Sequence, residues 1–202
     1  DEVAGKMLQA SLEERGLQFL LNAQTESLIG NACGQVAAVR FKDGLEIPAD
    51  LVVMAAGIRP NTTLAEKAGV LCNRGIVVTD TMQTVTDPRV YAVGECAAHR
   101  GIAYGLVAPL YDQAKVCANH LAHMGIGRYE GSVTSTKLKV TGVDLFSAGN
   151  FQGSADSEEI LLHDAVGGVY KKIVLKDDCI VGAVMYGDTG DGASYFQMLR
   201  EK

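Results

Sequence analysis

Residues 75–119 read GIVVTDTMQTVTDPRVYAVGECAAHRGIAYGLVAPLYDQAKVCAN, and this stretch decides the fold. Its apolar segment 90–93 predicts a buried strand, which Gly94 and Glu95 follow directly. About ten residues later, residues 106–109 open a helix, because proline is favoured in a helix's first turn. A strand, a Gly-acid pair and a helix in this order predict an α/β fold with a ligand crevice at the carboxyl end of the strand.

Two features of this stretch point at the same ligand. Glu95 brings a carboxylate to the strand end, and Gly94 leaves room for a ligand to approach the backbone. The first helical turn, at Val107, Ala108 and Pro109, brings the positive dipole end of the helix and the free N–H groups of Val107 and Ala108 to the same crevice. One acid and one helix N-terminus are therefore expected to converge on one ligand.

This layout resembles the second FAD-binding segment of the flavoprotein disulfide-reductase-like family, whose members bind two dinucleotides. Glu95 stands where that family usually has Asp, and Val85, flanked by two threonines, stands where it usually has Thr. The resemblance implies that Glu95 accepts a hydrogen bond from a ribityl hydroxyl of FAD. It also implies that the helix N-terminus at residues 107–109 points at the flavin pyrimidine carbonyl.

Residues 1–57 predict part of a second α/β domain. A helix with apolar positions at helical spacing ends at Gly16, and strands are expected at 17–21 and 35–41. Asp43-Gly44 is a tight hairpin signal. Residues 51–56 form a continuous apolar run, as expected for a strand covered on both faces.

The last predicted strand leads into Gly57-Ile58-Arg59-Pro60-Asn61, where glycine permits a sharp exit and proline enforces one. Alone this motif is weak, and an ordinary strand-to-loop turn explains it equally well. At its spacing from Gly94-Glu95 it resembles the crossover from the NAD(P)H-binding domain to the FAD domain in the same family. The resemblance adds Gly57 and Pro60 to the cofactor-binding candidates.

After Gly125 the composition changes to strands and turns, which predicts a separate α+β domain with an antiparallel sheet. Residues 176–178 are expected to form a hairpin turn, and 193–200 a final helix. The aspartates of segment 187–192 suggest either a calcium loop or a helix N-cap, and the cap is favoured because no closing glutamate follows. The predicted strands are 136–140, 144–148, 159–163, 169–175 and 179–185.

Composition excludes several classes of protein. The formal net charge is −6 without a long basic run, which argues against nucleic acid as a partner. No apolar run approaches the length of a membrane span, and no signal-peptide pattern opens the sequence. Five scattered cysteines without metal-site spacing fit buried thiols in a reducing cytoplasm and predict no metal site. A cytoplasmic protein is therefore expected.

The resemblance narrows to the nitrite reductase branch of the family and covers the whole chain. The segments that carry it are 91–96, 99–110, 113–117, 134–142 and 186–189. It implies that NAD(P)H reduces FAD, and that electrons then pass through iron-sulfur centres to sirohaem, where nitrite becomes ammonium. It also implies partners: the remaining domains of a parent chain, a small subunit, and a second copy in a homo-oligomer.

The sequence contains no strand-linked G-x-G-x-x-G loop for a dinucleotide pyrophosphate, so we expect an internal fragment of a longer protein. The expected domains are 1–57, the closing half of an NAD(P)H-binding domain; 58–125, the closing part of an FAD-binding domain; and 126–202, the C-terminal α+β domain. Two alternatives stay open. One is an FAD-dependent NADH-rubredoxin or ferredoxin reductase, and the other is a C-terminal domain that serves dimerisation or docking.

Overall fold

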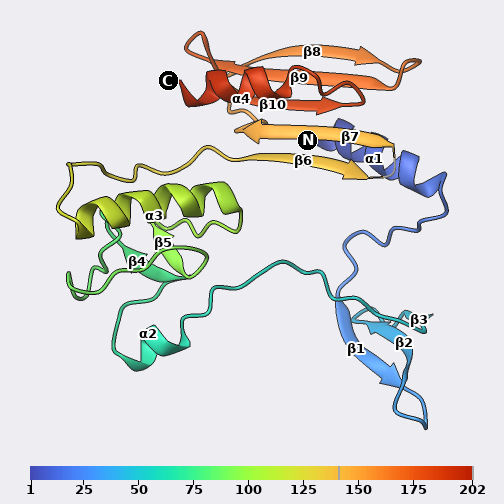
Figure 1. Cartoon of the computed structure of the whole chain (residues 1–202). Helices are drawn as coiled ribbons and strands as arrows, with labels where there is room; N and C mark the ends of the chain where they lie inside the picture. The colour runs from blue at the N-terminus through green and yellow to red at the C-terminus, as the bar shows by residue number, and fades with distance from the viewer. Residues whose placement is uncertain (141, 202) are drawn as a thin grey trace. The chain divides into compact units, whose positions relative to one another are not determined.

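A computed structural model describes residues 1–140 and 142–201, so Thr141, inside the family-like segment 134–142, lies outside the described residues. Contacts divide the chain into two compact units. One consists of residues 6–57, and the other of residues 58–202 together with residues 1–5. Figure 1 shows the mixed α/β content that the sequence predicts.

The smaller unit holds most of helix α1 (Glu2–Glu13) and an antiparallel three-stranded sheet. Gly16 follows the helix with a φ of +92°, as expected of a glycine that ends a helix. The sheet has the order β1-β2-β3, with strands β1 (Thr25–Gly30), β2 (Val36–Phe41) and β3 (Glu46–Pro48). The hairpin predicted at Asp43-Gly44 joins β2 to β3 and is confirmed: Gly44 has a φ of +89°, and the Phe41 amide donates to the Leu45 carbonyl at 2.9 Å.

Two strands predicted in this unit are wrong. Residues 17–21 and 51–56 form no strand, and no described strand pairs with either segment. Their apolar side chains stay in solvent, with Leu51 80% and Met54 87% exposed. A continuous apolar run becomes a strand only where neighbouring strands supply backbone partners and cover both faces, and the described residues provide neither.

In the larger unit, helix α2 (Thr63–Lys67) and helix α3 (Val107–Leu121) accompany a short parallel pair, β4 (Ile76–Val78) and β5 (Ala97–His99). The strand predicted at 90–93 is wrong: only Tyr91 makes a bridge, an isolated one to Gln83. Pairing starts instead at β5, after the Gly94-Glu95 turn.

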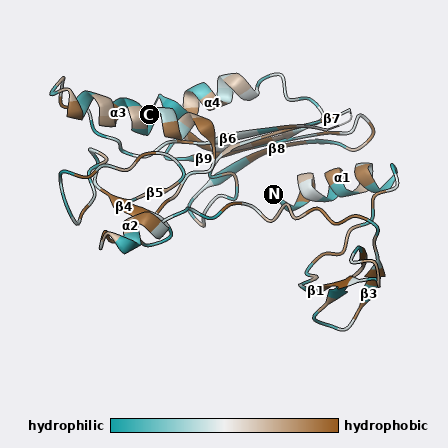
Figure 2. Ribbon diagram, turned by 60° about the horizontal axis from the view of Figure 1, so that its bottom comes forward, coloured by the Kyte–Doolittle hydropathy of each residue, from teal (hydrophilic) through white to brown (hydrophobic). Residues whose placement is uncertain are grey.

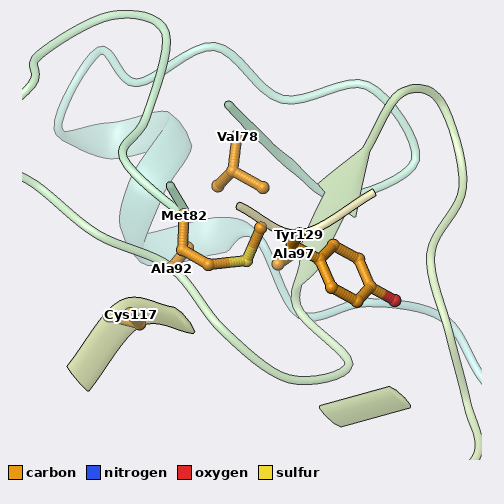
Figure 3. Packing of buried hydrophobic residues seen from close by; sticks show 6 residues of the cluster. All are labelled: Val78, Met82, Ala92, Ala97, Cys117 and Tyr129. Atoms are coloured by element: carbon orange, nitrogen blue, oxygen red, sulfur yellow. The ribbon is translucent and has the colours of Figure 1, made fainter. Parts of the chain in front are cut away.

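An apolar cluster packs α3 against this parallel pair. Its buried members, drawn in Figure 3, are Val78, Met82, Ala92, Ala97, Cys117 and Tyr129. They come from β4, the turns around it, β5, α3 and the segment after α3, so the cluster joins parts far apart in sequence. Figure 3 shows the Tyr129 oxygen pointing away from the other side chains, so the ring fills the core while the hydroxyl is left to bond elsewhere.

The C-terminal part is a five-stranded antiparallel sheet in the order β6-β7-β10-β9-β8. All five predicted strands are confirmed within two residues at each end: β6 (Ser135–Val140), β7 (Val143–Gly149), β8 (Glu158–Asp164), β9 (Val169–Lys176) and β10 (Cys179–Tyr186). The predicted hairpin between β9 and β10 is confirmed too, since Asp177 and Asp178 have φ of +51° and +59°, as in a type I′ turn.

Helix α4 (Gly192–Arg200) runs along one face of this sheet, as Figure 1 shows. Leu199 packs there on Phe146, Ala148 and Met185. Figure 2 colours α4 both brown and teal, as expected of a helix with one apolar face. At Gly192 a Cβ would lie 2.9 Å from the Phe146 ring, so the close approach of the helix requires glycine.

The aspartates before α4 have a different role from the one expected. Asp191 occupies the N-cap position but makes no side-chain cap hydrogen bond. Instead the Lys171 ammonium on β9 donates to Asp188 at 2.6 Å and to Asp191 at 3.2 Å. An ion pair to the sheet, and not a helix cap, therefore accounts for these acids.

The tight packing of β10 gives a test of the C-terminal sheet. At buried Gly182 a Cβ would overlap the backbone of Asn150 and Phe151. Gly182→Ala should therefore lower the free energy of unfolding by about 1–3 kcal/mol, measured by urea denaturation. The matched control is Gly127→Ala, where a Cβ meets nothing within 4 Å and φ is not positive. Equal stability of the two variants would contradict this packing.

Candidate flavin-facing site

The Gly94-Glu95 turn presents a carboxylate without a partner. Gly94 has a φ of +94°, which favours glycine, and a Cβ there would meet nothing within 4 Å. Its carbonyl accepts the Ala97 amide at 3.0 Å, which closes the turn. Glu95 is exposed, and its carboxylate makes no hydrogen bond or ion pair with any described residue. This acid is free to accept a hydrogen bond from a ligand.

Helix α3 begins at Val107, two residues before the proline that marks its first turn in the sequence. Leu106 is the N-cap residue, in extended conformation, and offers no side-chain cap. Val107 is 66% exposed, whereas Pro109 is buried against the protein. The first-turn N–H groups of Val107 and Ala108 therefore have neither an intrahelical acceptor nor a cap, and the positive end of the helix dipole is open to a ligand.

A single side chain connects these two features. Gln113, in the second turn of α3, is fully buried, and its Oε1 accepts the Gly94 amide at 3.0 Å. Six residues separate Val107 from Gln113, which corresponds to about 9 Å along the helix axis. The structure thus joins the Gly94-Glu95 turn to the second turn of α3, about 9 Å along the axis from the helix N-terminus.

The other two candidates lie elsewhere. Pro60 is half-buried and lines a cleft of about 670 Å³ with residues 101–103, a cleft that includes neither Gly94 nor Glu95. Ile58 packs closely on Gly105: a Cβ added to Gly105 would lie 2.9 Å from the Ile58 Cδ1 atom. Gly57 is exposed, has a φ of +82° and belongs to the smaller unit.

An ion-pair network beside the site was missed by the sequence reasoning. Asp80 lies 2.8 Å from Nε2 of His99, which is only 2% exposed, and accepts from Arg100 at 2.9 Å. Hydrogen bonds from Arg100, then those from His99, lower the pKa of Asp80 from 3.8 to about 2. The only signal in the sequence was His99-Arg100 after a Gly-acid pair, and nothing marked Asp80 as its partner.

The segment after α3 is anchored by Tyr129, which was also missed. Its amide donates to the Asp80 carbonyl at 2.8 Å, and its ring meets the His99 ring edge-on at 4.9 Å. Burial raises the pKa of Tyr129 to about 12, so the phenol stays protonated and its hydroxyl, 2.9 Å from Ser132 Oγ, can donate to it. Ser132 in turn donates to Asp112 of α3 at 3.1 Å.

The cysteines differ from the expectation of buried thiols. Only Cys117 is buried, whereas Cys33 and Cys179 are exposed; none of the five forms a disulfide. Among the described residues, no three His, Cys, Asp or Glu side chains gather to hold a metal ion. Within that same part of the chain, no helix has both the length and the apolar character needed to cross a membrane.

Comparison with known protein families shows which family this chain belongs to. Residues 1–120, more than half of the chain, match the family described as pyridine nucleotide-disulphide oxidoreductase. The chain belongs to this oxidoreductase family. Residues 135–202 match a second family, described as the rubredoxin NAD+ reductase C-terminal domain.

Curated relatives of this oxidoreductase chain include nitrite reductases. It is 55% identical over all 202 residues to nitrite reductase [NAD(P)H] of Bacillus subtilis, of which it covers 25%. In an alignment of 204 positions that includes 98% of this chain, it is 33% identical to the nitrite reductase (NADH) large subunit of Escherichia coli, of which it covers 24%. The chain therefore spans about a quarter of the length of these relatives.

Solved structures support the fold. A FAD-dependent pyridine nucleotide-disulphide oxidoreductase from Desulfovibrio vulgaris matches with a TM-score of 0.79 and 24% identity, over all of this chain and 54% of that one. The ferredoxin reductase of Rhodopseudomonas palustris matches with a TM-score of 0.78 and 21% identity. The match covers 93% of this chain and 46% of that one. Both likenesses establish a shared fold.

The site residues of this oxidoreductase fit the flavin end of FAD. A hydroxyl of a polyol can donate to the unpaired Glu95 carboxylate, and a carbonyl can accept from the open N–H groups at Val107 and Ala108. The space beside Gly94 is empty enough for such a group to approach. In contrast, residues 6–57 contain no glycine-rich phosphate loop, so we assign no NAD(P)H contact there.

The network around Asp80 gives a pH test of this oxidoreductase chain. Because the native pKa lies below the ordinary value, the stabilisation is complete above about pH 5 and is lost as pH falls from 4 to about 2. Asp80→Asn should therefore be less stable than the wild type at neutral pH, and the difference should shrink across this range. Chemical denaturation at a series of pH values measures it. The exposed Asp50→Asn is the control, and a difference that stays constant down to pH 2 would contradict the assignment.

Proposed function

We propose that the chain is the flavin-facing part of an NAD(P)H-dependent nitrite reductase. The observation that carries the proposal is the 55% identity to the Bacillus subtilis nitrite reductase over the whole chain. A 47% identity over 95% of the chain to the assimilatory nitrate reductase electron transfer subunit of the same organism also favours an electron-transfer role in nitrogen assimilation.

In this proposal the residues of this chain would hold the flavin end of FAD, which would supply the means of passing electrons from NAD(P)H toward iron-sulfur centres and sirohaem outside this chain. Glu95 binds a ribityl hydroxyl. At the α3 N-terminus, residues 107–109, the N–H groups of Val107 and Ala108 would donate to the pyrimidine carbonyl, whereas Pro109 has no N–H; the positive helix end would favour negative charge on that carbonyl. The open space beside Gly94 admits the ribityl chain. Gly57 and Pro60 mark the crossover between the NAD(P)H-binding and FAD-binding parts.

We propose the domain boundaries 1–57, 58–125 and 126–202 for the same reasons. The chain would work in the cytoplasm with the remaining domains of a longer protein, a small subunit and a second copy. The share of about a quarter that it covers in its relatives supports the longer protein.

A second candidate is a reductase of rubredoxin or ferredoxin. It is favoured by the match of residues 135–202 to the rubredoxin NAD+ reductase C-terminal domain. The nitric oxide reductase FlRd-NAD(+) reductase of Klebsiella pneumoniae is a further reductase relative, 35% identical over 147 residues. That relative aligns with 73% of the chain, whereas the nitrite reductase aligns with all of it, so the first candidate is better supported.

An acceptor assay on the longer protein separates the two candidates. NAD(P)H oxidation that depends on nitrite and yields ammonium is the expected result. Faster reduction of rubredoxin, with nitrite left unconsumed, would favour the second candidate and overturn the first.

The role of Glu95 predicts the flavin affinity of the longer protein. A hydrogen bond to a charged group contributes about 1.5–3 kcal/mol, so Glu95→Ala should weaken FAD binding roughly ten- to over a hundredfold. Glu95→Gln keeps an acceptor without the charge and should fall between. Titration of the apoprotein with FAD, followed by flavin fluorescence, measures both. Wild-type affinity in Glu95→Ala would rule out the flavin role of this carboxylate.

The isolated 202-residue chain should purify without flavin and without NAD(P)H oxidation. It lacks a phosphate-binding loop, and one carboxylate with one helix end cannot replace the pyrophosphate contacts. An absorption spectrum of the purified chain checks this. A stoichiometric flavin absorption band would show the prediction to be wrong.

A further inference from the structure

The two polar atoms of the buried Gln113 side chain differ in their hydrogen bonding. Its oxygen accepts the Gly94 amide at 3.0 Å, across 19 residues of sequence. Its buried nitrogen, Nε2, makes no hydrogen bond of ordinary length with a described residue, although an interaction of the Gln113 side chain with Tyr129 lowers the pKa of that phenol. A buried N–H group without a full hydrogen bond is costly for the folded state.

That cost makes a purely space-filling role a poor explanation. Pro109, Gln113 and Cys117 form the buried stripe of α3, and a methionine would fill the Gln113 position without a buried amide. What methionine cannot supply is the acceptor for the Gly94 amide. The oxygen is therefore the part of the side chain that the site needs.

The hydrogen bond acts on the residue directly before Glu95. The Gly94 amide is held by Gln113, and the Gly94 carbonyl is held by the Ala97 amide. Gly94 has a positive φ and open space around it, so its own side of the turn offers no packing that would fix the backbone. The direction in which the Glu95 carboxylate leaves the turn thus depends on these two bonds.

We propose that Gln113 is a positioning residue that fixes the Gly94-Glu95 turn on helix α3, and so aims the Glu95 carboxylate at the flavin ribityl chain. The same helix supplies both the Gln113 oxygen and the N-terminal N–H groups at Val107 and Ala108. One rigid element then sets the spacing between the acid and the helix end. The flavin part of this inference rests on the proposed function.

The first test needs no flavin. In Gln113→Met the exchange rate of the Gly94 amide should rise roughly 2- to 10-fold, as expected for loss of one ordinary hydrogen bond. NMR of the chain measures it. Gln113→Glu keeps an oxygen acceptor and should restore the protection. Gln83→Met is the matched control: it removes a 2.7 Å hydrogen bond to the Pro88 carbonyl without touching the turn.

The second test asks whether Gln113 acts through Glu95. In the longer protein, Gln113→Met should weaken FAD binding when Glu95 is present and should have no further effect in a Glu95→Ala background. Additive losses would mean that Gln113 acts independently and would overturn the proposal. An unchanged Gly94 exchange rate in Gln113→Met would also overturn it, whatever the FAD result. If that rate rises but Glu95→Ala keeps full FAD affinity, the proposed flavin function fails while the hydrogen bond stands.

Discussion

The hydrogen bond from the Gly94 amide to the buried Gln113 side chain joins the turn that presents Glu95 to the helix that presents its N-terminus. Both features would be ordinary if they stood apart, because exposed acids and open helix ends are common on protein surfaces. The Glu95 carboxylate and the α3 N-terminus can bind one ligand together only if the distance between them is fixed. The apolar cluster around Met82 and Cys117 supports this bond by holding α3 against β4 and β5.

The C-terminal sheet could be predicted strand by strand, because its strands are neighbours in the sequence. Hairpin signals such as Asp177-Asp178 set the register locally, and alternating patterns identify the faces. The predictions failed at 51–56 and 90–93 for the opposite reason. Apolar runs of that kind become strands only beside other strands, and no described segment pairs with 51–56.

The candidate site was partly accessible from the sequence. Glu95 and the first turn of α3 around Pro109 follow from the order of residues, since a Gly-acid pair after an apolar run and a proline in a first turn are local signals. The ties among Asp80, His99 and Tyr129 were not accessible, because they join residues 19 to 49 positions apart through tertiary packing alone. In the sequence, Gln113 is one residue of a family-like segment. Its hydrogen bond to the Gly94 amide is a tertiary contact that the sequence alone does not predict.

The most direct measurement of the central claim is a crystal structure of the longer FAD-loaded protein. The account predicts a ribityl hydroxyl within hydrogen-bond distance, about 2.5–3.0 Å, of a Glu95 carboxylate oxygen, and the flavin pyrimidine carbonyl at the N-terminus of α3. A flavin bound with its ribityl chain away from Glu95, or with its pyrimidine ring away from Val107 and Ala108, would contradict it.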